Sequence, residues 1–227
     1  MKKQISPLFM FLGILFCVCL ILSNILATKL IIVGGLSATA GLLVFPISYI
    51  INDIIVEVWG YSRTRQLIWV AFGMNFLVII LMQLSVTLPP APYWTGQDAY
   101  AAAFSQTPRI ACASLVAFLA GSFTNAYIMS RMKIRSQGKR FGLRAVISTL
   151  FGETADSLFF FTVAFAGVIG WKEILVMILV QSCLKSIYEV VVLPVTIPLV
   201  RRIKRMEQTD IFDDHISYHI LRVKEVS

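Results

Sequence analysis

The sequence predicts an all-α integral membrane protein of six transmembrane helices, with both chain ends in the cytoplasm, and three observations lead to this fold class. Hydrophobic residues make up 58% of the 227 positions and charged residues only 14%, whereas soluble domains are about a quarter charged. The apolar residues form runs that are long enough to cross a bilayer. The positive charges, which give the chain a net charge of +8, lie almost entirely in the short segments between these runs.

Six apolar stretches reach the length that a helix needs to cross the hydrocarbon core, which is about 20 residues. The connections between them contain the Gly and Pro residues that mark turns. The predicted spans are residues 8–28, 37–59, 66–88, 109–130, 145–170 and 173–200. The turn signals are Gly34-Gly35, Gly60, Pro89-Pro90 with Pro92, Gly138 and Gly170.

The positive charges predict the orientation of the spans, because lysine and arginine are concentrated in cytoplasmic loops. They collect before the first span, after the second, after the fourth and after the sixth. The alternate connections contain only Lys29, Arg109 and Lys172. An even number of spans is needed to place every basic segment on the cytoplasmic side, and six is even. We therefore predict two cytoplasmic chain ends and an external loop between Leu88 and Arg109.

The chain divides into a transmembrane domain over residues 1–205 and a cytoplasmic tail over residues 206–227. The tail combines charges with a short apolar pattern that begins at Ile211, and this pattern predicts a small surface helix. Lys2 and Lys3 before an apolar run also resemble a signal peptide. Cleavage there would leave five spans and break the charge pattern, so we expect the first run to be retained.

The sequence predicts no cofactor, no metal site and no nucleic-acid partner. The four cysteines lie inside apolar runs and form neither a disulfide framework nor a metal-ligand spacing. His215 and His219 have an i, i+4 spacing, but no set of Cys, Asp or Glu completes a metal site around them. The sequence contains no Walker A loop for ATP.

Six ionisable residues lie inside the predicted spans, where a charge is costly. They are Asp53 and Glu57 in the second span, Glu153 and Asp156 in the fifth, and Lys185 and Glu189 in the sixth. A charged residue at bilayer depth costs at least about 2.5–3.5 kcal/mol, so these groups should face a partner or a water-filled cavity. Each pair is spaced i, i+3 or i, i+4 and therefore lies on one face of its helix.

At about 1.5 Å per residue, these groups fall within a layer a few turns thick. Asp156 and Glu189 lie near the midplane, and the other carboxylates lie nearer to the cytoplasm, Glu57 nearest of all. Lys185 and Glu189 are expected to form an ion pair within their helix. Five carboxylates with one ammonium need protons, a cation or a ligand rich in hydrogen-bond donors to neutralise them. Polar residues of other spans can join this layer: Ser23, Asn24, Asn75 and Asn125.

Two features favour a binding site between two halves of the chain. Pro46 interrupts the second span, and Pro194 and Pro198 interrupt the sixth, so that kinks can free backbone carbonyls to line a cavity. Spans one to three and four to six have opposite orientations, with an acid pair on the middle span of each half. This arrangement fits an inverted 3+3 repeat with a site at its interface. The alternative is that the polar groups only hold the helices together.

Three motifs occur in the same order as in one transporter family. The first runs from Asn52 to Gly60 in the second span and follows Phe45-Pro46. The second runs from Ser148 to Gly152 in the fifth span and continues to Asp156, Ser157 and Phe160. The third is Lys185-x-x-Tyr188-Glu189 with Pro194-x-Thr196, and Ser23-Asn24 fits the first-span pattern. On these motifs, residues 8–205 resemble the queuosine precursor transporters, which were earlier grouped as putative vitamin uptake transporters.

The resemblance implies an inner-membrane transporter, not an enzyme, that imports 7-deazaguanine compounds for the synthesis of queuosine in transfer RNA. Such compounds are 7-cyano-7-deazaguanine and 7-aminomethyl-7-deazaguanine. The candidate substrate-binding residues are Asn24, Asp53, Glu57, Phe151, Glu153, Asp156, Phe160, Lys185 and Glu189.

Asp53 and Asp156 are the candidates for the main contact with such a substrate. A guanine-type edge presents two adjacent N–H donors, which one carboxylate can accept in a bidentate contact. The candidates for stacking on the flat ring are the aromatic residues Phe151, Phe159, Phe160 and Trp59.

Two other interpretations remain open at this point. In one, the chain is a substrate-binding subunit that takes its energy from a separate ATPase module, as six-helix vitamin-capturing subunits do. In the other, it is an intramembrane aspartyl protease that uses Asp53 and Asp156. Those enzymes have Tyr-Asp and Gly-x-Gly-Asp contexts, whereas Asn52 and Ala155 precede the two acids here. The sequence also leaves open whether the chain forms a homo-oligomer.

Overall fold

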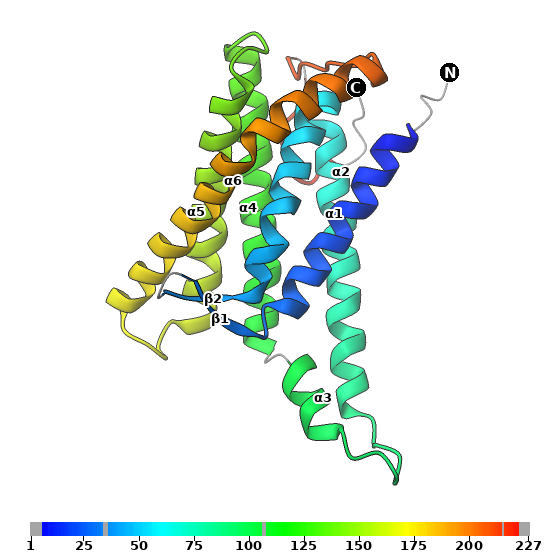
Figure 1. Ribbon diagram of the computed structural model, residues 1–227, viewed down its shortest axis with the longest axis vertical. Helices are drawn as coiled ribbons and strands as arrows, with labels where there is room; N and C mark the ends of the chain where they lie inside the picture. The colour runs from blue at the N-terminus through cyan, green and yellow to red at the C-terminus, as the bar shows by residue number, and fades with distance from the viewer. Residues whose placement is uncertain (1–5, 34–35, 106–107, 215, 223–227) are drawn as a thin grey trace.

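Helices dominate the computed structural model, which describes residues 6–33, 36–105, 108–214 and 216–222 (Figure 1). Five helical stretches in these ranges are long and apolar enough to cross a membrane, which confirms the prediction of an all-α multi-pass membrane protein. The helices are α1 Pro7–Leu26, α2 Phe45–Thr87, α3 Gln97–Phe104, α4 Pro108–Arg135, α5 Phe141–Phe165 and α6 Trp171–Glu207. Between α1 and α2 lie an antiparallel hairpin of β1 (Leu30–Val33) and β2 (Leu36–Thr39) and the 3₁₀ turn Ala40–Leu43. The predicted turn at Gly34-Gly35 lies outside the described residues.

Helix α2 is broken at Gly60, where the backbone has a φ of 81° and a ψ of 171°. A positive φ of this size is strained for a residue with a Cβ atom, so glycine permits the break. Figure 1 shows that the chain reverses there, so that the first limb of α2 (45–59) and the second limb (61–87) run in opposite directions. The predicted turn at Gly60 is confirmed, and the second limb begins earlier than the predicted residue 66.

The first limb of α2 begins later than the predicted span. Residues 37–39 belong to β2, and the helix begins at Phe45 with Pro46 in its first turn. Proline lacks an N–H, and its fixed φ suits the first helical turn, so Pro46 starts the helix. The prediction that Pro46 interrupts the second span is therefore wrong, whereas Pro194 and Pro198 do lie inside α6.

The tail after α6 is not helical in its described part and lies against the Gly60 break. Asp213 Oδ2 accepts hydrogen bonds from the backbone N–H of Tyr61 (2.9 Å) and from Ser130 Oγ (2.5 Å). Arg65 donates hydrogen bonds to two tail carbonyl oxygens, at 2.8 and 2.9 Å. The prediction of a small surface helix is wrong, because the tail satisfies polar groups by binding α2 and α4 rather than by coiling on itself.

Both limbs of α2 share one hydrophobic core with α1, α4 and α6. Helix α5 packs against α4 and α6 and completes the bundle. In Figure 1 the start of α1, the Gly60 break and the end of α6 lie at one end of the bundle, and α3 lies at the other. The ionisable pairs of the first limb, of α5 and of α6 come from segments that are far apart in the sequence.

Candidate functional site

Four carboxylates and one lysine, from the first limb of α2, from α5 and from α6, come together inside the bundle. Lys185 Nζ lies 2.8 Å from Glu153 Oε2 and 3.1 Å from Asp156 Oδ2. Asp53 and Glu189 complete the group and are close enough to interact electrostatically with each other. All four acids are buried, and Asp53 and Glu153 have no exposed surface. We call these five residues the carboxylate cluster.

Two aromatic residues that sequence reasoning missed lie against the carboxylate cluster. Lys185 Nζ lies 3.8 Å from the centroid of the Phe45 ring, a favourable cation–π arrangement. The Phe45 and Tyr49 rings contact each other, with centroids 5.4 Å apart. Their spacing carried a usable signal, because Phe45, Tyr49 and Asp53 follow one another at i, i+4 steps and so share one helix face.

The predicted ion pair between Lys185 and Glu189 is not formed. The lysine instead reaches across to the two carboxylates of α5. A lysine four residues before a glutamate has the less favourable of the two orientations for a pair within a helix. Two acceptors on the neighbouring helix outweigh one acceptor in that orientation.

Several polar groups in and beside the cluster have no hydrogen-bond partner within the described part of the chain. They are both carboxylate oxygens of Asp53 and of Glu189, the Tyr49 hydroxyl and the Asn125 amide. Asn125 of α4 lies close enough to Asp53 to interact with it, but the two side chains form no hydrogen bond of good geometry. A buried polar group without a partner costs about 1–3 kcal/mol, and more when it is charged. The site therefore has free capacity for protons or for a ligand with hydrogen-bond donors.

Two glycines let α4 and α5 approach closely beside the cluster. A Cβ atom on Gly121 would lie 2.8 Å from Asp156 Cβ, and one on Gly152 would lie 2.8 Å from Asn125 Cβ. Such distances are too short for real side chains, so the two helices could not pack this way with larger residues. The glycines thereby bring Asn125 and Asp156 towards the first limb of α2.

Glu57 lies outside the carboxylate cluster, in a separate ionic network near the Gly60 break. Arg144 binds its carboxylate with two hydrogen bonds, at 2.6 and 3.0 Å. Lys204 Nζ lies 2.6 Å from Glu57 Oε1 and 2.8 Å from Asp210 Oδ1. Bidentate arginine contacts are strong and geometrically specific. Protein groups therefore compensate the charge of Glu57, which favours a structural role for this residue.

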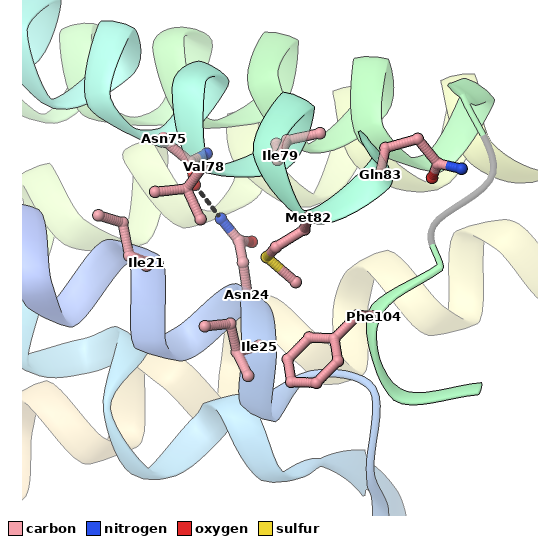
Figure 2. A pocket seen from close by; sticks show the side chains of 9 residues that line it. All are labelled: Ile21, Asn24, Ile25, Asn75, Val78, Ile79, Met82, Gln83 and Phe104. Carbon is pink, nitrogen blue, oxygen red and sulfur yellow. Dashed lines mark hydrogen bonds between the residues drawn. The ribbon is translucent and has the colours of Figure 1, made fainter. Parts of the chain in front are cut away.

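Asn24 also lies apart from the cluster, near the end of α1. Its Nδ2 donates to Asn75 Oδ1 (3.0 Å), and its Oδ1 accepts from Ser114 Oγ (3.1 Å). Figure 2 shows this amide pair at a pocket between α1 and the second limb of α2, with Phe104 of α3 at its edge. The cavity measures about 10 Å³, which is enough for one water molecule and too small for a purine.

The aromatic residues predicted to stack on a substrate are not brought to the cluster. Phe151 and Phe159 are 56% and 43% exposed. Phe160 packs against neighbouring rings of α5, and Trp59 packs edge-on against a ring of α1. Phe151 is two residues from Glu153, so the two side chains point to nearly opposite faces of the helix.

Comparisons with known proteins agree with the motifs in the sequence. The sequence model of the family described as "Putative vitamin uptake transporter" matches residues 39–199. These residues include the carboxylate cluster and the Gly60 break in α2. No solved structure matches the chain.

Three curated proteins are similar to the chain. The queuosine precursor transporter of Escherichia coli (strain K12) is 29% identical over 143 residues, which cover 63% of this chain and 62% of that protein. The probable queuosine precursor transporter of Bacillus subtilis (strain 168) is 27% identical over 147 residues, 64% of each chain. That of Haemophilus influenzae is 27% identical over 128 residues, 56% of this chain and 52% of that protein. The similarity thus spans less than two thirds of each relative.

Proposed function

This chain belongs to the putative vitamin uptake transporter family, and we propose that it is a secondary transporter of the inner membrane that imports queuosine precursors. Membership confirms the resemblance seen in the three motifs, and it supports the proposal of a multi-pass membrane transporter. The substrate proposal is supported by the relatives named as queuosine precursor transporters.

The observation that carries the proposal is the carboxylate cluster, where buried acids outnumber the single lysine. A 7-deazaguanine presents two adjacent N–H donors on its pyrimidine edge, and a carboxylate can accept both. Asp53 has two unpartnered oxygens for this contact. Asp156 is the second candidate, once a substrate or a movement of α6 draws Lys185 away from it.

We assign the stacking contact to Phe45 and Tyr49 in place of the exposed phenylalanines. Both rings belong to the same helix face as Asp53, and Phe45 already holds the Lys185 ammonium against its face. The flat heterocycle of a 7-deazaguanine can stack in the place of that cation. Glu57 and Asn24 would then act by holding the helices, because their polar atoms are bound by other protein groups.

The proposed membrane topology has six spans, because the two limbs of α2 count separately. The first limb has 15 residues and, at about 1.5 Å per residue, covers roughly 22 Å, so residues before Phe45 would complete the crossing. The charge pattern favours a cytoplasmic position for the Gly60 break and for both chain ends. We also propose that spans one to three and four to six form an inverted 3+3 repeat.

Uptake of 7-cyano-7-deazaguanine into cells that cannot make it tests the function. We expect such cells to form queuosine at low external precursor only when this protein is present. Asp53→Asn and Asp156→Asn should each reduce uptake with near-normal amounts of protein in the membrane. Adenine, which lacks the paired donors, should compete poorly. Equal competition by adenine, or wild-type uptake by both variants, would remove the carboxylates from the recognition role.

Reconstitution of the chain alone into liposomes separates the secondary transporter from an ATPase-driven subunit. Transport of the precursor by the purified chain without ATP supports the secondary transporter. Binding without transport, together with co-purification of ATPase subunits, would favour the other mechanism.

A further inference from the structure

The carboxylate cluster contains two acids, Asp53 and Glu189, that form no ion pair within the described part of the chain. Lys185 is paired with Glu153 and Asp156 on α5. Asp53 on α2 and Glu189 on α6 are close enough to interact electrostatically, and none of their four carboxylate oxygens has a hydrogen-bond partner within the described residues. Both residues are at most 1% exposed.

The groups around this acid pair do not neutralise it. From α5 the ionisable groups that act on the pair are Glu153, which adds negative charge next to Glu189, and Arg144, which attracts Asp53 but already binds the Glu57 carboxylate with two hydrogen bonds. From α4 the polar neighbour is Asn125, which carries no charge. From α2 the neighbours are Tyr49 and Glu57, and Glu57 adds further negative charge. Lys185 on α6 is already shared between two other carboxylates. Two neighbouring acids in such surroundings cannot both ionise without a large cost, which one bound proton would relieve.

A proton fits this place better than a metal ion. Within the described residues, no three His, Cys, Asp or Glu side chains are grouped closely enough to hold a metal. The Asn125 amide is buried, without a partner, and directed at Asp53, so it can support either protonation state of the acid.

We propose that Glu189, together with Asp53, forms the binding site of a co-transported proton, which makes the chain a proton-coupled symporter. This inference rests on the proposed function. When a neutral precursor donates its two N–H groups to ionised Asp53, the proton resides on Glu189 and the occluded pair carries one negative charge instead of two. The proton enters from the external solution with the substrate and leaves to the cytoplasm with it.

Liposomes containing the purified chain test the coupling, with radiolabelled 7-cyano-7-deazaguanine and the membrane potential held at zero. An inside-alkaline gradient of about one pH unit should raise accumulation up to about tenfold, the limit for one proton per substrate. A pH dye trapped inside the liposomes should report acidification on addition of substrate. This second measurement needs no variant and is unaffected by folding defects.

The variant Glu189→Gln resembles the protonated residue in shape and should fold. Its uptake should be the same with and without the pH gradient, and it should acidify the lumen no more than empty liposomes do. Glu173→Gln is the matched control, because Glu173 is an exposed acid in the first turn of α6, and this variant should respond to the gradient like the wild type.

The outcomes separate the two proposals. Suppose that the wild type exchanges labelled for unlabelled precursor, but that its uptake does not respond to the pH gradient or responds only to a sodium gradient. This result would overturn proton coupling and leave the transport function standing. Absence of any exchange by the wild type would overturn the transport function itself. Gradient-driven accumulation by Glu189→Gln equal to that of the wild type would remove Glu189 from the proton site.

Discussion

At the scale of single residues, Lys185 determines the charge balance of the buried site. Its ammonium holds Glu153 and Asp156 together and rests on the Phe45 ring, with only 12% of its side chain exposed. Removing a partner from a buried ion pair leaves an uncompensated charge, which costs about 3–5 kcal/mol or is relieved by protonation. The residue therefore contributes to folding as well as to any binding step.

Lys185→Ala should lower the stability of the purified protein by about 3–5 kcal/mol, and Glu153→Gln in the same chain should restore part of that loss. Glu189→Gln should restore less, because Glu189 does not contact the lysine. Thermal unfolding in detergent of the single and double variants measures this. If the losses from Lys185→Ala and Glu153→Gln simply add, the two residues are not coupled and the assignment of the pair is wrong.

At the scale of elements, the close packing of α4 on α5 sets the shape of the site. Gly152→Ala should destabilise the protein by about 1–3 kcal/mol, because its Cβ would overlap with Asn125 and with the backbone of α4. Gly73→Ala is the matched control: its Cβ would meet no atom within 4 Å, and alanine in a helix is favoured over glycine by about 1 kcal/mol. Equal thermal shifts for the two variants would mean that the α4–α5 contact is looser than described.

The tail is a second element whose attachment can be tested, through the ion pairs of Asp210. Burial raises the pKa of this carboxyl, but the hydrogen bonds from Lys133 and Lys204 outweigh it and lower the pKa below its usual value. A carboxyl with a lowered pKa stabilises the docked tail at pH values above its usual pKa of about 4. This contribution is lost as the pH falls through the lowered pKa. The pKa of Asp213 shifts in the opposite direction, because burial raises it.

Asp210→Asn should therefore speed proteolysis of the tail severalfold at neutral pH, and the difference from the wild type should shrink as the pH falls below about 4. The control Asp214→Asn removes an exposed acid from the same segment and should change little. A pH-independent difference between Asp210→Asn and the wild type would show that the charge of Asp210 is not what attaches the tail.

At the scale of the whole molecule, the proposed topology follows from the break in α2. Reporter fusions after Arg65, within residues 131–144 and after Arg205 should read cytoplasmic, and a fusion near Gly96 should read external. A cytoplasmic signal at Gly96 would require an even number of crossings before α3 and would overturn the six-span topology.

The sequence by itself determined the membrane class, the family and the identity of the buried acids. Long apolar runs specify helices in lipid regardless of their neighbours, and Gly60 specifies a break through its own backbone freedom. The motifs around Asp53, Asp156 and Lys185 were sufficient to find the family.

Only the tertiary structure decided which of these residues meet. Helical spacing shows which residues share a face, but not which face of another helix lies opposite, so the partners of Lys185 on α5 could not be predicted from α6 alone. The same holds for Glu57, whose charge is balanced by Arg144 and Lys204 across large sequence separations. The site is formed by the packing of α2, α4, α5 and α6. This packing depends on how the side chains of different helices fit together, which the spacing of residues along one helix does not reveal.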